Sequence, residues 1–455
     1  PVARQGGDLD VSFDPFVQSP VSFTAVELQS TGQSIVAAPL VTINGSNYQG
    51  LLRFNTNGSL DNSFTTPLDY FPDYRQLIVM PNDQILVVEF GTDSYIRRLN
   101  ANGSLDNTFN SPGYYASTIF SIGYQSDNKV LFSIYDDPAA GVFLYRLNAD
   151  GTFDNSFTPI PDFTANVIVQ QTDGKILAAG PSGIIRVEDS GSLDPTFTAI
   201  SALDGDVTDM VIQSNGKIVL VGTFTGINGF PARNIARLNS DGSIDTGFLA
   251  GNGFSLYAGA QPNSLKLLAS DNLLVAGEFT SYNDEVRTRV LVLNADGSLQ
   301  CSFDPQAGPN ASVVDAAVQA DGKILIVGGL TNYDGTPRNA FARVNGIATS
   351  CVPASERAAL VALYNATNGS SWTNKTNWLS ADENTWFGVT VTGCRVTNLF
   401  LTTNNLTGSI PTEIGDLPAL QTLQLENNLL AGSIPTSIGN LTNLTSLDLR
   451  GNQLS

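Results

Sequence analysis

The chain has 455 residues, 42% of them hydrophobic, so it is long enough for two domains and too apolar to remain disordered. Its 42 acidic and 22 basic residues give a net charge of −20, which repels nucleic acid and anionic lipid surfaces. The sequence has no histidine, so the commonest general base, the commonest zinc ligand and every Ser-His or Cys-His nucleophilic pair are excluded.

The chain starts at Pro1 without a signal-like segment, and no apolar run is long enough to span a bilayer. We therefore expect a processed chain that does not insert into a membrane.

An eight-residue motif then recurs along the first three quarters of the sequence. It appears as "GGDLDVSF" ending at Phe13, and returns as "NGSLDNSF", "NGSLDNTF", "DGTFDNSF", "SGSLDPTF", "DGSIDTGF" and "DGSLQCSF". The seven phenylalanines lie 51, 45, 48, 40, 51 and 55 residues apart, which is the spacing of a repeat architecture.

Each repeat has the pattern of a four-stranded antiparallel meander. Between Phe197 and Phe248, "VTDMVIQSNGKIVLVGTF" is an alternating strand, an Asn-Gly turn and a more apolar strand, and we expect a type I′ hairpin there. "NIARLN" forms a third strand and "SIDTGF" a fourth. Four-stranded units of this length, stacked face to face, predict a seven-bladed β-propeller.

The two ends of the array are complementary. The last repeat stops at "FARVNG" without its fourth strand, and the chain begins with a spare one, so residues 9–13 should pair with residues 343–345 and close the ring. The predicted fold is mainly β, with the propeller over residues 1–347.

The motifs "DGKIL", "IARLN", "DGSID" and "GTFTGINGFPARNIARLN" resemble the bacterial delta-60 repeat, a β-propeller family of secreted and surface proteins. The resemblance implies a scaffold without a shared catalytic motif. Insertions at residues 224–233, 279–287 and 330–338 depart from the shorter repeats and predict longer loops on one side of the disc.

An aspartate recurs in the motif at positions 10, 61, 106, 154, 194 and 245, with Gln300 in its place in the seventh and last copy. We expect it to accept backbone N–H groups in the turn to the next blade. Asn148, Asp150, Thr152 and Asp154 also alternate in the manner of a calcium loop, but no acidic twelfth ligand follows.

From residue 348 the pattern changes to a second domain that ends at residue 455. "ASERAALVALYNATNG" predicts an amphipathic helix with Ser355 as its N-cap, and Trp372, Trp378 and Trp386 are expected in the core of an N-terminal cap over residues 351–395. Cys351 and Cys394 belong to this cap and are the expected disulfide pair, which leaves Cys301 free.

Residues 396–455 have leucines at 399, 423 and 447 and asparagines at 404, 428 and 452, both 24 apart. This spacing predicts a leucine-rich repeat solenoid with an asparagine ladder, and "GSIPTxIGxL" resembles its plant-type subclass. The chain stops at Ser455 with its last apolar surface uncovered, so we expect further repeats in the natural protein.

By the two-residue alternation of a strand, nine solenoid positions should be exposed and available for binding. They are Asn398, Phe400, Thr402, Thr422, Gln424, Glu426, Ser446, Asp448 and Arg450.

Three functions are compatible with these features. The first is an extracellular or cell-surface, non-catalytic binding or adhesion protein with protein or glycan partners, and the second is a self-assembling subunit of a surface fibre or sheath. The third, a metal-dependent hydrolase or lyase at the propeller channel, is disfavoured because the inner strands, such as "ANVIVQQ" and "SVVDAAVQ", are rich in Val, Ile, Ala and Ser. No cofactor is predicted.

Overall fold

The computed structural model describes residues 6–18, 21–68, 77–90, 93–115, 118–136, 141–201, 203–256, 260–300, 302–348, 352–380, 383–392 and 394–455. The chain forms two compact units. The larger covers residues 7–300 and 305–346, and the smaller covers residues 347–455 with short pieces around Gly6 and Phe303.

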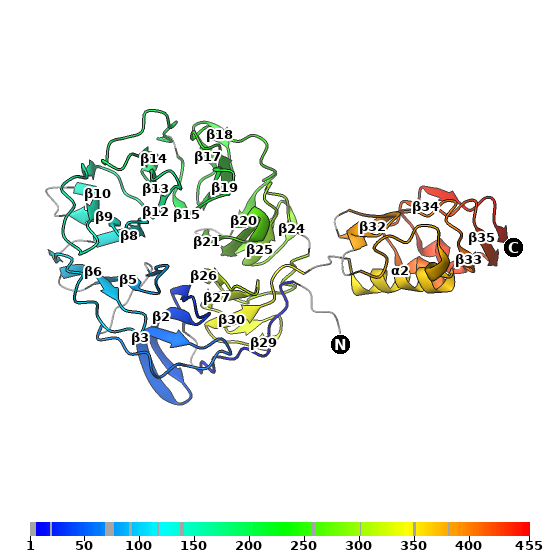
Figure 1. Ribbon diagram of the computed structural model, residues 1–455, viewed down its shortest axis with the longest axis horizontal. Coiled ribbons are helices and arrows are strands. Elements are labelled where there is room, and N and C mark those ends of the chain that lie inside the picture. The colour runs from blue at the N-terminus through cyan, green and yellow to red at the C-terminus, as the bar shows by residue number, and fades with distance from the viewer. Residues whose placement is uncertain are drawn as a thin grey trace. The chain divides into compact units, whose positions relative to one another are not determined.

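The larger unit is a ring of seven antiparallel sheets, one for each repeat predicted from the sequence (Figure 1). The first three blades are built from β1 (Ala25–Leu28), β2 (Ser34–Ile43) and β3 (Ser46–Phe54); β4 (Leu77–Val79), β5 (Ile85–Glu89), β6 (Asp93–Leu99) and β7 (Tyr114–Tyr115); and β8 (Thr118–Tyr124), β9 (Val130–Asp136), β10 (Gly141–Leu147) and β11 (Ile160–Pro161).

The remaining four blades are built from β12 (Val167–Gln170), β13 (Ile176–Gly180) and β14 (Gly183–Val187); β15 (Val207–Ile212), β16 (Ile218–Gly222) and β19 (Ile235–Leu238); β21 (Pro262–Leu267), β22 (Leu273–Gly277) and β25 (Val290–Leu293); and β26 (Val313–Val318), β27 (Ile324–Gly328) and β30 (Phe341–Val344). The middle strands, such as β13 and β16, are buried along their whole length because blades pack on both faces.

The outer strand is shorter than the sequence predicts. In the fifth repeat only Ile244 pairs with β19, through Leu238, and the N–H of Phe248 then donates to the carbonyl of Asp245 in a turn. The same bridge and turn recur from blade to blade. The prediction of a full strand up to the phenylalanine was wrong because the aspartate side chain competes for the backbone N–H groups that a strand would need.

The hairpin after β15 also differs in detail from the prediction. The N–H of Gln213 donates to the carbonyl of Lys217, and the three-residue loop between them ends on Gly216 at φ +80°. A type I′ turn needs two residues with positive φ, so this loop is instead the three-residue type in which one left-handed residue forms a bulge.

Three blades carry an extra hairpin between their middle and third strands, where the sequence predicted longer loops. These are β17 (Gly226–Ile227) with β18 (Phe230–Pro231), β23 (Phe279–Tyr282) with β24 (Glu285–Val286), and β28 (Asn332–Tyr333) with β29 (Thr336–Pro337). β20 (Phe254–Leu256) joins the second of them, and a one-turn helix η1 (Ala269–Asp271) precedes β22. In the first blade the strands β2 and β3 are themselves long.

The N-terminal segment lies against the last blade. Leu9 pairs with Val344, and the N–H of Asp10 donates to the carbonyl of Arg343 over 2.8 Å. The hydroxyl of Tyr333 donates to the carbonyl of Gly7. The segment that precedes the first blade therefore supplies the outer edge of the last one.

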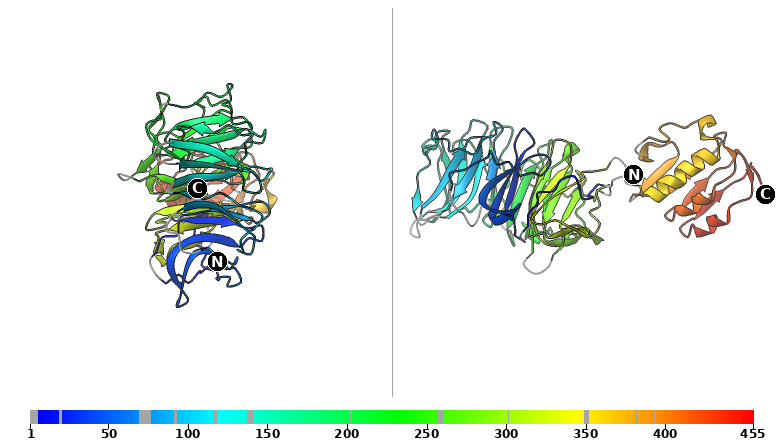
Figure 2. Two further views of the ribbon diagram at one scale, coloured as in Figure 1. Left: turned by 90° about the vertical axis from the view of Figure 1, so that its left-hand side faces the viewer. Right: turned by 90° about the horizontal axis from the view of Figure 1, so that it is seen from below.

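The smaller unit begins with helix α2 (Ala354–Ala366), which lies along one side of the solenoid in Figure 2. The helix begins two residues earlier than predicted, with Pro353 as N-cap, so Ser355 lies in its first turn and is not the cap. Proline suits this position because the first N–H groups of a helix have no intrahelical partner.

Two parallel ladders form the solenoid. One contains β32 (Arg395–Phe400), β34 (Thr422–Gln424) and β36 (Ser446–Asp448), with β31 (Val389–Thr392) paired antiparallel to β32 at its edge. The other contains β33 (Thr407–Gly408), β35 (Leu429–Gly432) and β37 (Gln453–Leu454). Short 3₁₀ helices lie at η2 (Gly369–Ser371), η3 (Glu383–Thr385), η4 (Thr412–Asp416) and η5 (Thr436–Asn440).

The three tryptophans are buried in the cap, as predicted. Their indole N–H groups donate to the carbonyls of Thr367 and Phe387 and to the hydroxyl of Ser380. Glu356 of α2 accepts the N–H of Val396 at 2.9 Å and pairs with Arg395, which ties the helix to the first leucine-rich strand.

Candidate functional site

Six of the nine solenoid positions singled out from the sequence form two rows across the parallel sheet, and Thr402, Glu426 and Arg450 follow the ends of its strands. Residues 398, 422 and 446 are in register, as are residues 400, 424 and 448. None of the nine is buried, whereas the alternating leucines at 399, 401, 423 and 425 are fully buried. The sheet therefore presents one continuous polar face that includes one aromatic ring, that of Phe400, which is 41% exposed.

The asparagine ladder holds this face in shape. The side-chain amide of Asn428 donates to the carbonyls of Leu401 and Leu425, and its oxygen accepts the N–H groups of Asn404 and Leu406. Asn452 repeats the pattern one turn later, and Asn404 bonds to Asn374 of the cap. Each turn is thus locked to its neighbour by buried hydrogen bonds, as the spacing predicted.

Cys394 precedes β32 and is engaged in a disulfide. Its predicted partner Cys351 and the third cysteine, Cys301, both lie outside the described residues. The pairing stays a prediction.

In the propeller, the recurrent aspartate has a larger role than the sequence suggested. In the second blade Asp106 Oδ1 accepts the N–H and the hydroxyl of Thr108, which is the predicted turn contact. Its Oδ2 accepts Arg98 Nε at 2.7 Å, and the guanidinium lies 4.8 Å above the ring of Phe109. Arg98 also reaches across to the carbonyl of Ala149 in the next repeat.

This Arg-Asp-Phe unit recurs in six blades. Its members are Arg343, Asp10 and Phe13; Arg53, Asp61 and Phe64; Arg98, Asp106 and Phe109; Arg146, Asp154 and Phe157; Arg186, Asp194 and Phe197; and Arg237, Asp245 and Phe248. In the sixth repeat Val292 and Gln300 stand where the others have Arg and Asp. The charges are therefore lost together, because a lone buried arginine would be unstable.

The hydrogen bonds from Thr108 and Arg98 outweigh the effect of burial and lower the pKa of Asp106 to about 2. The calcium interpretation of residues 148–154 is disfavoured by the same contacts. Asp154 Oδ2 pairs with both Arg146 and Lys129, and Asp150 Oδ1 accepts the N–H and hydroxyl of Thr152. These oxygens already bind cations or donors of the protein itself.

One group of charged residues breaks the repeat, and the sequence analysis missed it. Glu27, Asp209, Lys266 and Asp315 lie on the innermost strands β1, β15, β21 and β26, which are neighbours around the channel. Lys266 Nζ lies 3.6 Å from Glu27 Oε1 and 3.5 Å from Asp315 Oδ1. The description of the inner strands as rich in Val, Ile, Ala and Ser overlooked these residues: three of the four strands carry a carboxylate and the fourth carries a lysine.

Two of the carboxylates clamp neighbouring strands. Asp209 Oδ2 accepts the N–H of Leu265 at 2.7 Å, and Asp315 Oδ2 accepts the N–H of Val26 at 3.0 Å across the first and last blades. Both aspartates follow a register shift in their strand, which turns backbone donors away from the ladder. They therefore link the innermost strands of neighbouring blades to one another.

The remaining two side chains, Glu27 and Lys266, are each 31% exposed. Burial raises the pKa of Glu27 to about 7. The nearby Asp315 and Asp209 carboxylates also raise this pKa, whereas the Lys266 ammonium lowers it. Burial likewise raises the pKa of Asp209 to about 6. Burial alone would lower the pKa of Lys266, but the three carboxylates outweigh it and hold that pKa above the usual range. Glu27 can therefore exchange a proton near neutral pH beside a permanent cation.

Sequence reasoning could have found this group by aligning the inner strands on the glutamine that ends several of them. Asp209 and Asp315 each lie four residues before that glutamine, and Glu27 lies two before it. The signal is charge where β12 has apolar residues: Glu27 aligns with Val169, and Asp209 and Asp315 align with Val167. Among the described residues, no group of three or more His, Cys, Asp or Glu side chains could hold a metal ion.

The geometry defines the class of protein: a seven-bladed β-propeller joined to a leucine-rich repeat solenoid with an aromatic cap. Sequence profiles agree. The repeats match the family described as "Domain of unknown function (DUF5122) beta-propeller" over residues 29–64, 81–109, 125–157, 171–197, 213–248, 269–303 and 319–346. Residues 394–454 match the leucine-rich repeat family. The chain belongs to the DUF5122 β-propeller family, of the delta-60 type, and carries leucine-rich repeats after it.

Known structures resemble the two parts separately. Virginiamycin B lyase from Staphylococcus aureus is 12% identical over 72% of this chain and 96% of its own, with a TM-score of 0.46. The leucine-rich ectodomain of the receptor kinase SOBIR1 from Arabidopsis thaliana is 29% identical over 23% of this chain, with a TM-score of 0.19, and only 56% of that ectodomain is covered. Neither likeness carries an argument about activity. No curated protein matches the chain.

Both domains are of classes that serve as scaffolds for protein interactions. None of the helices in the described part of the chain is long and apolar enough to cross a membrane.

Proposed function

We propose that this protein is a non-catalytic binding protein that works outside the cell and contacts a protein or glycan partner through the strand face of its solenoid. The observation that carries the proposal is a set of nine exposed or half-exposed side chains, six of them in two in-register rows, that alternate on the first two strands with buried leucines. A rigid face of this kind presents its side chains without the cost of ordering a loop on binding.

The first and last strands of the face offer different chemistry. Phe400 supplies an exposed aromatic ring of the type that dominates binding energy in many interfaces. Asp448 and Arg450 form an ion pair at 2.6 Å, and Arg450 remains accessible at the margin. An aromatic anchor with charged neighbours suits a partner that is amphipathic and not uniformly charged.

The extracellular location is supported by the disulfide at Cys394, because disulfides persist in oxidising compartments and are rare in the cytosol. Fractionation of producing cells, followed by mass analysis of the cap peptides without reduction, tests this point. Recovery of the protein only in the cytosol with all thiols reduced would refute the location.

The binding test uses the purified chain, an array of glycans and extracts of the producing cell's surface. We expect Phe400→Ser to weaken any interaction found by at least about tenfold, because hot-spot aromatic residues contribute this much or more. Leu429→Ser is the matched control, since Leu429 is 49% exposed but lies in the other ladder of the solenoid. Equal effects of both variants would reject the strand face as the contact surface.

The non-catalytic part of the proposal is supported by the absence of histidine from the sequence and by the clamping role of Asp209 and Asp315. A catalytic activity would contradict this part of the proposal, and the charged residues of the innermost strands are where we would look for one, because Glu27 lies beside Lys266. A hydrolytic or elimination activity that survives purification and disappears in Glu27→Gln would show that the protein is an enzyme.

A further inference from the structure

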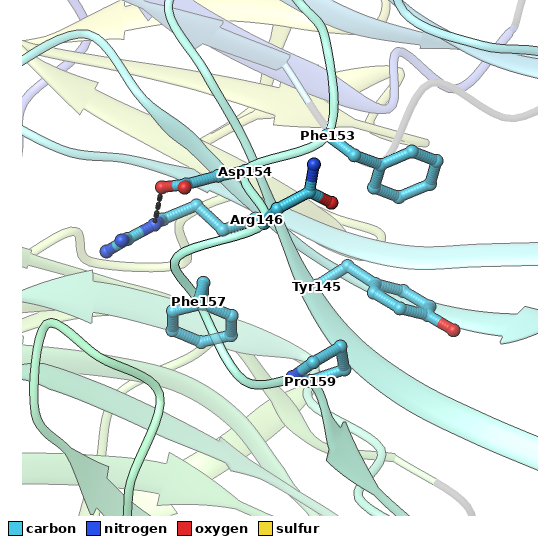
Figure 3. Close-up of a pocket in the computed structure, with 7 residues that line it drawn as sticks. Tyr145, Arg146, Phe153, Asp154, Phe157 and Pro159 are labelled. Atoms are coloured by element: carbon cyan, nitrogen blue, oxygen red, sulfur yellow. Dashed lines mark hydrogen bonds and ion pairs between the residues drawn. The ribbon is translucent and has the colours of Figure 1, made fainter.

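The third blade contains a pocket of about 330 Å³ that is lined by Tyr145, Arg146, Phe153, Asp154, Asn155, Phe157 and Pro159. Figure 3 shows the rings of Phe153 and Tyr145 on one side of it and the Asp154–Arg146 pair on the other. Phe153 is 41% exposed and the amide of Asn155 is exposed, whereas Arg146 and Asp154 are buried. The pocket thus combines an aromatic wall with a polar wall.

The aromatic wall is absent from the other repeats. At the position of Phe153 they have Leu9, Leu60, Leu105, Leu193, Ile244 and Leu299, and at the position of Tyr145 they have Leu52, Arg97, Ile185, Ala236, Leu291 and Ala342. Phe153 forms the same bridge to Leu147 that Leu105 forms to Leu99. The blade therefore does not need an aromatic residue at this position.

Further aromatic rings hold these two side chains in place from behind. Tyr145 stacks on Phe132 with 5.7 Å between ring centroids and meets Phe153 edge to face at 5.7 Å. Phe153 also contacts the ring of Tyr114. A supported ring loses little side-chain freedom when a ligand packs on its exposed surface.

We propose that this pocket binds one pyranose ring of a glycan, an inference that rests on the proposed binding function and names a ligand class for the propeller. A pyranose has an apolar face of C–H groups and a rim of hydroxyls. The C–H face fits against Phe153 and Tyr145. The hydroxyls need groups that both donate and accept hydrogen bonds, as the amide of Asn155 does. The buried Asp154–Arg146 pair lines the opposite wall and fixes its shape, since its charges are already satisfied within the protein.

The volume favours a sugar over an extended peptide. Pockets for small ligands start at about 300 Å³, so this one holds a single ring-sized unit. A proline-rich peptide would require an aromatic-lined groove that continues over several residues. A peptide is therefore an outcome of the test and not the proposed ligand.

The experiment is saturation-transfer NMR and calorimetric titration of the full chain with methyl glycopyranosides of the gluco, galacto and manno series and with a proline-rich peptide. We expect at least one glycoside to bind with a dissociation constant of about 1–10 mM, as a ligand with so few atoms should. The strongest transfer should fall on the C–H face of the sugar.

Two variants test whether the glycoside binds in this pocket. Their replacement residues are taken from the equivalent positions of other blades. Phe153→Leu and Tyr145→Leu copy residues found in sister blades, so they should fold, and each should weaken the glycoside about tenfold. Phe230→Leu is the control, an exposed phenylalanine on β18 of another blade, and should change nothing. Absence of glycoside binding, binding that both pocket variants leave intact, or binding of the peptide alone would each overturn the proposal.

The two proposals fail independently. Loss of surface binding in Phe400→Ser with no glycoside bound would leave the solenoid function intact and reject the pocket. Glycoside binding that depends on Phe153, together with no effect of Phe400→Ser on surface binding, would support the pocket and reject the solenoid face as the contact surface.

Discussion

Asp106 and Arg98 are each less than one-tenth exposed and neutralise one another. The sequence alone suggested the loss of a turn hydrogen bond, about 1–2 kcal/mol, for an alanine at any of positions 61, 106, 154 or 245. The structure raises this figure, because the alanine would also leave a buried guanidinium without its partner.

We therefore expect Asp106→Ala to lower the free energy of unfolding of the propeller by about 3–5 kcal/mol in urea titrations. The double variant Arg98→Val with Asp106→Gln copies the neutral residues of the sixth repeat and should cost less than the single one. A double variant that is less stable than Asp106→Ala would show that the ion pair is not the reason for the loss.

At Glu27, pH and stability are linked. The pKa of its carboxyl is about 7 in the folded protein, against an ordinary value of 4.5. Between these two pH values the folded state retains a proton that the unfolded chain has released, so this contribution to stability is lost as pH rises through the window.

The variant Glu27→Gln should therefore match the wild type below pH 4.5 and exceed it in stability above pH 7, as measured by urea unfolding over this range. Lys266→Met removes the ammonium that opposes the rise in pKa, so the fall in stability should begin at the same pH and extend to higher pH. A wild type and a Glu27→Gln variant whose stabilities run parallel from pH 4.5 to 7 would contradict the linkage.

At the scale of elements, the segment before the first blade is the part that completes the last one. Gly7, Asp10 and Asn345 exchange backbone hydrogen bonds with the facing strand, Asp10 pairs with Arg343 and Lys323, and Phe13 packs edge to face on Phe341 at 5.0 Å. Its removal would expose an unpaired edge and leave Arg343 without its carboxylate.

We expect deletion of residues 1–13 to lower the melting temperature of the propeller by many degrees. A synthetic peptide of residues 6–13 should restore part of the loss in a concentration-dependent way, since a ligand that binds only the folded state stabilises it. An unchanged melting curve after the deletion would mean that the segment does not close the ring.

At the scale of the whole molecule, each of the two units has its own hydrophobic core, and the solenoid core contains the cap tryptophans together with the repeat leucines. Independent cores predict two unfolding transitions in calorimetry. Asp106→Ala should shift one of them and Asn428→Ala the other, by about 1–3 kcal/mol for the buried hydrogen bonds of the ladder. If both variants shift a single transition together, the units unfold as one.

The sequence by itself determined the features that are coded locally and repeated. The number of blades, the asparagine ladder and the alternation that exposes residues 398, 400 and 402 all follow from the spacing of a few residue types, and each repeat can be interpreted without its neighbours. The same evidence could not show that the outer strand gives way to a turn after Leu105, because that depends on which acceptor captures each N–H group.

Only the tertiary structure decided what happens where repeats meet. Glu27 and Asp315 are 288 residues apart in the chain, yet Asp315 binds the first blade because the array is circular. The charges of the channel and the aromatic wall at Phe153 each occur once, so the periodicity of the sequence does not predict them. The role of a residue that departs from the repeat depends on its contacts in space, and closure of the ring determines which residues those contacts include.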